Sequence, residues 1–407
     1  MGGRASVHAA SAGDVVAAVS PQEARPHIPF ARTLIPPEAE AAVSRVLSSG
    51  WITTGPEVTA FEREFAALVG ADHAVAVSSC TAALELALRA LGLPRGARVA
   101  TSTMTFCGAV HAIVHAGLSP VLVDIDPWTL MPSPETVARA VARVDGVEAM
   151  VVLHFAGFPA QVGELAAAAG LPLDRVVEDA AHAVGTWVGE RPVGALSAAT
   201  CFSFYATKNL PIGEGGMLTT DDPQVAEQVR RSRQHGMSRD AWRRYLPGGG
   251  WRYTIEAPGL KANMTDLQAA IGRAQLLHLP AWQRRRDELA SRYDRGLLGL
   301  PGLRTPPWPA DGRHAWHLYV LQVDPAFGLG RDEVIAGLAE RGIDCSVHFI
   351  PLHHQPYFVG LFSDALAGQF PAADAAFERI VSLPLHPGLT NDEVDRVCET
   401  LAELGAA

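Results

Sequence analysis

The sequence lacks the features that mark membrane, secreted and nucleic-acid-binding proteins. No uninterrupted apolar run approaches the roughly 20 residues that a membrane-spanning helix needs. The formal net charge is −10, whereas nucleic-acid binders usually carry a basic surface that neutralises phosphates. Residues 1–27 are rich in Ala, Ser and Gly and lack the apolar segment of a secretory signal, which predicts a flexible leader. These absences predict a cytoplasmic protein with neither a membrane nor a nucleic acid as partner.

Patterns typical of disulfide frameworks and metal sites are also missing. The five cysteines stand far apart and include no C-x-x-C pair, which favours reduced thiols. His111 and His115 are four residues apart, a spacing that can bind a metal on a helix, but no third ligand is evident. We therefore expect no metal site.

The chain does have an ordinary globular composition, with 407 residues of which 48% are apolar. From about residue 28, short apolar runs alternate with amphipathic helical patterns, which predicts an α/β fold: a mostly parallel sheet with helices on both faces. After about residue 281 the pattern changes to a smaller α+β unit. The predicted organisation is a leader (1–27), a large domain (28–280) and a small C-terminal domain (281–407).

Three finer expectations concern individual elements. The strands predicted for the large domain are 74–77, 98–101, 119–124, 149–153, 176–178 and 200–204. A long helix should begin near Asp266, and Pro280 should interrupt or end it. Residues 343–349 should form a strand of the small domain.

The segment TCFSFYATKN of 200–209 carries a lysine into a loop directly after an apolar β run, and the glycine cluster GEGG of 213–216 follows. A lysine with a neutral amine can form a Schiff base with an aldehyde cofactor. Ser203 lies close enough in sequence to Lys208 to donate its hydroxyl to a phosphate there, and the glycines would allow a tight turn beside a cofactor. Taken alone, the pattern also fits a surface lysine in a turn.

An acidic residue follows an earlier apolar strand, in the segment VVEDAAH of 176–182. Pyridoxal 5′-phosphate (PLP), the aldehyde cofactor that lysines carry, needs a carboxylate against its ring nitrogen. Asp179, at the carboxyl end of a parallel strand, is placed for that role, whereas Glu178 points to the opposite side of the strand. The alternative role for Asp179 is the N-cap of a following helix.

A phosphate site and a stacking partner complete the requirements. In SSCTAA of 78–83 a strand gives way to a helix, so free backbone N–H groups and the helix dipole would face an anion, and Thr81 adds a hydroxyl. Simple N-capping by Ser or Thr is the alternative. Phe106 follows another strand and could stack on a planar ring, although an aromatic residue there is more often part of the core.

Taken together, these segments resemble the sugar aminotransferases of the DegT/DnrJ/EryC1/StrS family, which are fold-type I PLP enzymes. The resemblance covers nearly the whole chain from about residue 28. Its markers, in chain order, are TTGP of 53–56, SCTAAL of 79–84, EDAAHA of 178–183, SFYATKN of 203–209, GEGG of 213–216, NMTDLQAAIG of 263–272 and SLPL of 382–385.

The resemblance implies a role for each matching residue. Lys208 would carry PLP and move the proton, Asp179 would hold the ring nitrogen, and His182 would lie near the ring. Further cofactor contacts would come from Cys80, Thr81, Phe106, Ser203 and Asn263, the last of these reaching the phosphate of a neighbouring subunit in a homodimer with shared active sites. Substrate contacts would come from Thr54, His348, His353 and Tyr357.

The family relation also implies a reaction, the transfer of an amino group from glutamate or glutamine to a nucleotide-linked keto-sugar. SRDAWRRY of 238–245 is similar to the branch that makes 4-amino-4-deoxyarabinose by amination at C4. Ala262 and Phe106 depart from that branch, because an aromatic residue and, in some members, a tryptophan stand there.

Three alternatives stay open at this point. The acceptor could be a keto-cyclitol or another position of the sugar. The sugar dehydratases of the same fold carry a histidine at the lysine position, so Lys208 argues against that reaction. A PLP-binding regulator without turnover is the third, and no DNA-binding extension supports it.

Overall fold

The computed structural model describes residues 26–238, 252–362 and 368–406. Within them, seven strands form the central sheet, in the order β1-β9-β8-β5-β4-β2-β3. β9 runs antiparallel to both of its neighbours, and the other pairs are parallel. The predicted mostly parallel sheet is therefore confirmed. The strands are β1 (His73–Val77), β2 (Arg98–Ser102), β3 (Ser119–Val123), β4 (Ala149–Leu153), β5 (Val176–Asp179), β8 (Ala199–Ser203) and β9 (Gly216–Thr220).

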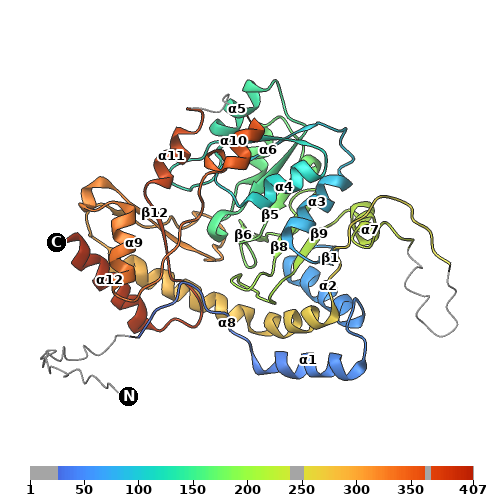
Figure 1. The fold of residues 1–407 in the computed structure, drawn as a ribbon, viewed down its shortest axis with the longest axis horizontal. Helices are drawn as coiled ribbons and strands as arrows, with labels where there is room; N and C mark the ends of the chain where they lie inside the picture. Colours follow the sequence, from blue (N-terminus) through green and yellow to red (C-terminus); the bar gives the residue numbers. More distant parts are fainter. Residues whose placement is uncertain (1–25, 239–251, 363–367, 407) are drawn as a thin grey trace, which may run out of the picture.

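Helices cover both faces of this sheet (Figure 1). Because successive strand residues point to opposite faces, Val75 and Val77 of β1 pack with residues of α3, α4 and α7, whereas Ala74 and Ala76 pack with residues of α2. The helices of this part are α2 (Pro56–Val69), α3 (Cys80–Ala90), α4 (Cys107–His115), α5 (Pro134–Arg143), α6 (Val162–Ala168) and α7 (Pro223–Ser232). The short pair β6 (Trp187–Val188) and β7 (Arg191–Pro192) lies apart from the sheet.

The C-terminal part has a three-stranded antiparallel sheet with a core of its own. Its strands are β10 (Leu303–Arg304), β11 (Tyr319–Val323) and β12 (Ile380–Leu383), and its helices are α9 (Arg331–Glu340), α10 (Pro356–Phe362), α11 (Pro371–Phe377) and α12 (Asn391–Gly405). The turn η5 (Leu352–His354) precedes α10. Within the described residues, no helix is long and apolar enough to cross a bilayer.

A single long helix, α8 (Asp266–Leu297), joins the two parts, and the expectation that Pro280 interrupts or ends it is wrong. The proline removes one N–H from the helix, but α8 packs against α1 (Pro37–Ser49), α2 and α12, and this packing keeps it continuous (Figure 1). The domain boundary predicted near 280 thus falls inside a helix and remains a prediction.

The strand predicted for 343–349 is not formed. The segment makes two isolated bridges, from Ile343 to Ile28 and from Ser346 to Ser382. Because Ser382 already pairs with β11 through Val320, the segment touches this edge at one residue, and its Val347 and Phe349 pack against the core of the large sheet.

Candidate active site

The carboxyl ends of the parallel strands open into a cavity of about 530 Å³. Residues that follow β1, β5 and β8 line it, as expected for a ligand site of a parallel α/β sheet. Of the predicted site residues, the cavity gathers eight: Cys80, Thr81, Phe106, Asp179, His182, Ser203, Lys208 and His348.

Lys208 lies in this cavity with its amine against an imidazole. Its Nζ is 3.5 Å from Nε2 of His317. The amide of Asn209 donates from Nδ2 to the carbonyl of Ala315, so its Oδ1 faces His317 Nδ1 at 3.2 Å and accepts a hydrogen bond from it. His317 therefore carries its proton on Nδ1 and presents the Nε2 lone pair to the lysine, which orients the amine.

Burial also changes the acidity of this amine. It lowers the pKa of Lys208 from its ordinary value of 10.5 to about 8, and the charges of Asp179 and Cys80 oppose this shift. A lysine with this pKa has a substantial neutral fraction near neutral pH, which a nucleophilic amine needs.

Asp179 ends β5 at the floor of the cavity and is only 5% exposed. Its Oδ1 accepts the N–H of Ala181 at 3.1 Å, and the Cys80 thiol lies 3.7 Å away. Burial raises the pKa of the carboxyl, and the Ala181 hydrogen bond and the Lys208 charge oppose the rise. The residues after Asp179 form a turn, so it is not the N-cap of a helix.

The start of α3 forms an anion-binding corner of the cavity. Ser79 caps the helix by accepting the N–H of Ala82 at 3.1 Å, which leaves the N–H groups of Cys80 and Thr81 without intrahelical partners. Gly216 of β9 packs against this corner, since a Cβ there would stand 2.4 Å from the Ser79 carbonyl carbon. The corner needs a glycine at 216, and it fits a phosphate.

Three further cavity residues have defined surroundings. His182 accepts the N–H of Ala156 at Nδ1, 3.2 Å away, and burial with the nearby Lys208 charge lowers its pKa well below the usual value. The ring is therefore neutral and carries its proton on Nε2. Phe106 is 62% exposed, so it is a wall of the cavity rather than core. His348 bonds the Ser382 hydroxyl at 2.8 Å.

Four predicted site residues lie outside the cavity of their own chain. Asn263 donates from Nδ2 to the Thr54 hydroxyl at 2.7 Å, and that hydroxyl donates to the carbonyl of Met264. Tyr357 is 56% exposed and packs on His111. The fourth is His353.

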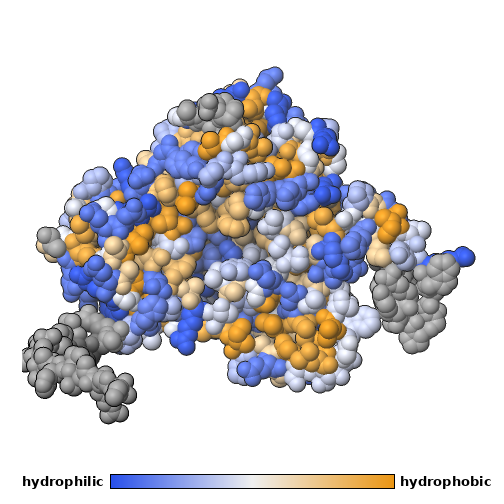
Figure 2. All heavy atoms as spheres, viewed as in Figure 1, coloured by the Kyte–Doolittle hydropathy of each residue, from blue (hydrophilic) through white to orange (hydrophobic). Residues whose placement is uncertain are grey.

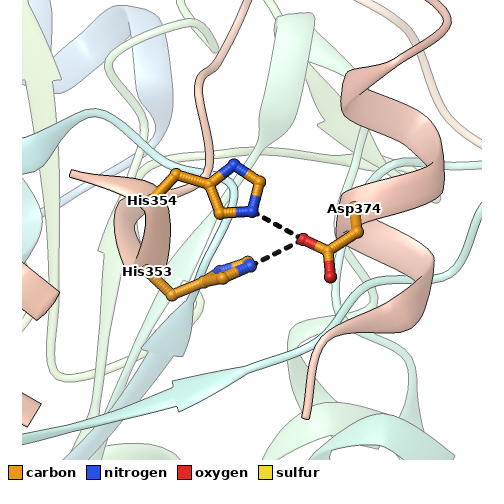
Figure 3. A group of neighbouring side chains, drawn as sticks. All are labelled: His353, His354 and Asp374. Carbon is orange, nitrogen blue, oxygen red and sulfur yellow. Dashed lines mark hydrogen bonds and ion pairs between the residues drawn. The ribbon is translucent and has the colours of Figure 1, made fainter. Parts of the chain in front are cut away.

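His353 ties the turn η5 to its surroundings. Its Nδ1 is 2.7 Å from the Thr103 hydroxyl and its Nε2 is 2.7 Å from Asp374 Oδ1, which His354 also contacts at 2.8 Å (Figure 3). The three side chains satisfy one another through hydrogen bonds. These hydrogen bonds hold η5 against α11, so His353 positions the η5 turn.

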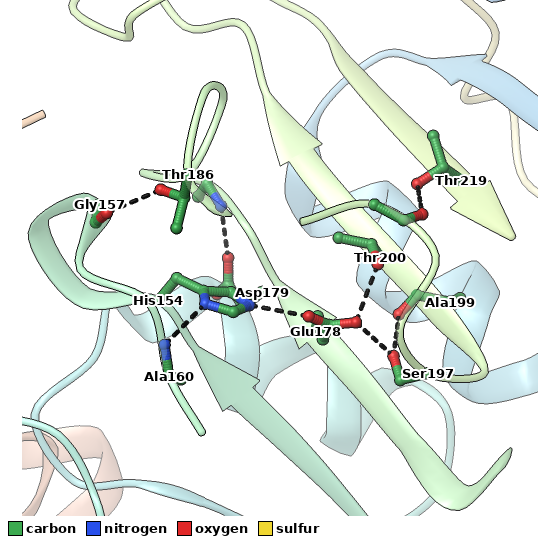
Figure 4. Close-up of polar contacts among 12 residues, drawn as sticks. His154, Gly157, Ala160, Glu178, Asp179, Thr186, Ser197, Ala199, Thr200 and Thr219 are labelled. Atoms are coloured by element: carbon green, nitrogen blue, oxygen red, sulfur yellow. Dashed lines mark hydrogen bonds and ion pairs between the residues drawn. The ribbon is translucent and has the colours of Figure 1, made fainter. Parts of the chain in front are cut away.

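Next to Asp179, Glu178 belongs to a separate buried network on the other side of the strand (Figure 4). His154 accepts the Ala160 N–H at Nδ1, so its Nε2–H donates to Glu178 Oε2 at 2.9 Å. The hydroxyls of Ser197 and Thr200 donate to Oε1 at 2.7 and 3.1 Å. The carboxylate thus accepts hydrogen bonds from two buried residues, His154 and Thr200, and from the half-buried Ser197.

Glu178→Gln is therefore expected to destabilise the fold. The amide has one accepting oxygen instead of two and carries no charge, so it loses charge-assisted hydrogen bonds to these donors, which should cost about 1–3 kcal/mol of unfolding free energy. Urea denaturation of the cofactor-free protein measures this. Glu227→Gln, which loses only a surface pair with Arg231, should cost less than about 1 kcal/mol; equal losses in the two variants would contradict the network's role.

Sequence reasoning did not find His317, Arg286, His386 or Arg32, which also line the cavity. They come from four separate segments, and only His386 stands beside a marker, directly after SLPL of 382–385. That signal named no chemistry for the histidine.

These residues fit PLP. A lysine with a lowered pKa, a buried carboxylate and a helix start that can bind phosphate surround one cavity, and an exposed aromatic ring forms its wall. When bound, PLP supplies an electron sink for bonds to a substrate carbon. The fold and the site thus define a PLP-dependent enzyme of the mostly parallel α/β class.

Comparison with known proteins identifies the family. The sequence model of the DegT/DnrJ/EryC1/StrS aminotransferase family matches residues 34–402, and the chain belongs to this family of PLP-dependent sugar aminotransferases. It is 48% identical over 379 residues to the spore coat polysaccharide biosynthesis protein SpsC of Bacillus subtilis, covering 93% of this chain and 97% of SpsC.

Solved structures agree with this assignment. The PLP form of the putative sugar aminotransferase Spr1654 from Streptococcus pneumoniae matches with a TM-score of 0.84 and 30% identity, covering 93% of this chain and 99% of that one. The aminotransferase TlmJ from Streptoalloteichus hindustanus matches with a TM-score of 0.83 and 34% identity, covering 94% and 99%.

Proposed function

We propose that this enzyme transfers an amino group from glutamate or glutamine to C4 of a nucleotide-linked keto-sugar. The observation that carries the proposal is the Lys208 amine, held by His317 in a cavity whose floor is Asp179. The name of SpsC, a spore coat polysaccharide biosynthesis protein, supports a sugar destined for a polysaccharide. The 4-amino-4-deoxyarabinose likeness rests on 238–245, of which 239–245 lie outside the described residues.

In this proposal the cavity residues divide the work. Lys208 would hold the cofactor through its amine and, as a neutral base, would move a proton within the cavity. Asp179 balances the charge at the ring nitrogen, and His182 directs its Nε2–H into the cavity, where an oxygen of the cofactor would accept it. The α3 corner with Thr81 and Ser203 binds the phosphate, and Phe106 stacks on the ring. His348 and the cavity mouth face the sugar.

We also propose a homodimer with shared sites. Asn263 and Thr54 are half-buried and bond each other outside the cavity of their own chain, so a contact with a cofactor would have to be with that of a second copy. Exposed apolar side chains gather over α1 and α8 (Figure 2), among them Leu47 at 58% and Leu277 at 74% exposure. Such a patch is typical of an interface.

A single-turnover experiment tests the reaction. PLP-loaded protein is mixed with glutamate or glutamine until the visible band of the lysine-bound cofactor disappears, and a panel of UDP- and dTDP-4-keto-sugars is then added. Return of the band with formation of an amino-sugar supports the proposal. If the donor removes the band and no nucleotide sugar restores it, the nucleotide-linked acceptor is wrong and keto-cyclitols or free keto-sugars become the acceptors to test.

The lowered pKa of Lys208 predicts the pH dependence of cofactor capture. Only the neutral amine attacks the aldehyde, so the capture rate of the cofactor-free protein should rise with pH and level off above about 8, rather than near the ordinary 10.5. Stopped-flow absorbance from pH 6 to 10.5 measures the midpoint. A midpoint near 10 would show that burial does not act on this amine.

A further inference from the structure

Arg286 is a buried cation to which the described part of the chain offers no anionic partner. It lies on α8, is 4% exposed and lines the cavity that holds Lys208. No carboxylate among the described residues pairs with it, and burial, unopposed by any acid, lowers its pKa to about 9. Burying a charge without a partner costs free energy. An anionic ligand bound to Arg286 would reduce this cost, because it would pair with the guanidinium.

The hydrogen bonds of Arg286 within the protein leave the Nε and Nη2 side of its guanidinium group for a ligand. Nη1 donates to the carbonyls of Trp316 and Leu385, each at 3.0 Å, and these two bonds fix the plane of the guanidinium. Both bonds involve only Nη1, so the Nε–H and Nη2–H groups remain available to a ligand. These two groups point in the same direction, which is the geometry that binds both oxygens of a carboxylate.

The surroundings of Arg286 carry positive charge or neutral donors. His386 is 4% exposed and lines the same cavity; it lies near the backbone of Pro29, but neither ring nitrogen completes a hydrogen bond within the described residues. Burial and, to a lesser extent, the charges of Arg286 and Arg32 lower the pKa of His386 to about 4, against an opposing effect of Glu393. The acids that line the cavity are Asp179, at the floor, and Glu214, whose side chain is exposed.

Arg286 lies in the same cavity as the reacting amine and is connected to it through two consecutive residues. It bonds the carbonyl of Trp316, and the next residue, His317, contacts Lys208 Nζ. In an α-amino acid the carboxylate is attached to the carbon that bears the amino group, so it must lie beside the group that receives the amine. The diphosphate of a nucleotide sugar, by contrast, is separated from C4 by the sugar ring and belongs at the mouth of the cavity.

We propose that Arg286, assisted by His386, binds the α-carboxylate of the amino-acid donor. This subsite rests on the proposed aminotransferase function and assigns the donor half of the reaction. The same donors serve the second half, since the fork can bind the hydroxyl oxygens of a keto-sugar that occupies the cavity after the keto acid has left. One subsite thus accepts two unlike substrates, the carboxylate more tightly because it is charged.

The test compares two amines that differ only in this carboxylate. PLP-loaded protein is titrated with L-glutamate or with 4-aminobutyrate, which is glutamate without its α-carboxylate, and loss of the visible band gives an apparent Kd and a rate for each. Arg286→Gln should raise the apparent Kd for L-glutamate about 10- to 100-fold and leave 4-aminobutyrate unchanged. The matched control is Arg284→Gln, an exposed arginine two positions away on α8, which should change neither.

The outcomes separate this proposal from the proposed function. If Arg286→Gln and Arg284→Gln show the same apparent Kd and rate with L-glutamate, the proposed subsite is wrong and the aminotransferase function is unaffected. If no amino acid converts the wild-type protein, the proposed function fails, and the donor subsite fails with it. Should Arg286→Gln not fold, Arg286→Lys keeps the charge but not the fork, and an unchanged glutamate-to-4-aminobutyrate preference in that variant would overturn the proposal.

Discussion

Lys208→Ala is expected to remove the visible absorbance of the bound cofactor and to lower turnover by at least about a thousandfold, since both the covalent attachment and the proton-transferring base disappear. The cavity itself should persist, because Lys208 is held through Nζ at 3.5 Å from His317 and is not part of the core. PLP would still bind without a covalent link, through the corner at the start of α3. Absorbance, circular dichroism and single-turnover rates measure these effects together.

The chain offers a sharp control, because it contains only two lysines, Lys208 and Lys261. Lys261 is exposed and pairs through its backbone with Gln234, so Lys261→Ala should retain both the band and the activity. Reduction with borohydride followed by peptide mapping should place the cofactor on the peptide of Lys208. A label on Lys261, or a reducible band that survives Lys208→Ala, would refute the assignment.

The part of the site that follows the strands could be predicted from sequence because local rules bring it together. Lys208, Asp179 and the α3 corner each follow a buried apolar run, and the carboxyl ends of parallel strands converge on one edge. Their spacing in sequence therefore did not matter. The same argument found Phe106, whose 62% exposure excludes the alternative of a core residue.

Elements decided by distant contacts were not predictable in the same way. Pro280 would end an isolated helix, but α8 is held by helices from both parts of the chain. β9 carries GMLTT directly after the glycine cluster and becomes a central strand only because β1 and β8 pair with its two edges. Residues 343–349 have a strand-like pattern, yet they form only two isolated bridges, one to Ile28 and one to Ser382.

Single site residues that lie far in sequence from the other site residues are the hardest to predict. Arg286 is one of three consecutive arginines on α8, and nothing in that run marks it as the buried one; the packing of α8 buries it and leaves Arg284 exposed. His317 acquires its tautomer from Asn209, a contact across more than a hundred residues. No motif encodes such pairs, because each depends on how the two parts of the molecule pack.

Asp179→Asn should lower the rate of the donor half-reaction by about two to three orders of magnitude while the protein stays folded and binds PLP. Burial raises the pKa of this carboxyl, so a cation beside it is needed to keep it charged: Lys208 acts this way in the cofactor-free protein, and the ring nitrogen would do so once PLP is bound. An amide has the same shape and still accepts the Ala181 N–H, but it carries no charge to hold a proton on that nitrogen.

Glu178→Gln is the matched comparison, because it makes the same chemical change at the preceding residue of β5. Its carboxylate bonds His154, Ser197 and Thr200 and lies outside the cavity, so that variant should lose stability and keep its rate per folded, PLP-loaded molecule. Asp179→Asn should show the reverse, with the band of the bound cofactor shifted and the unfolding midpoint nearly unchanged. If the two variants lose rate equally, the two neighbouring carboxylates do not have separate roles, and Asp179 is not the partner of the ring nitrogen.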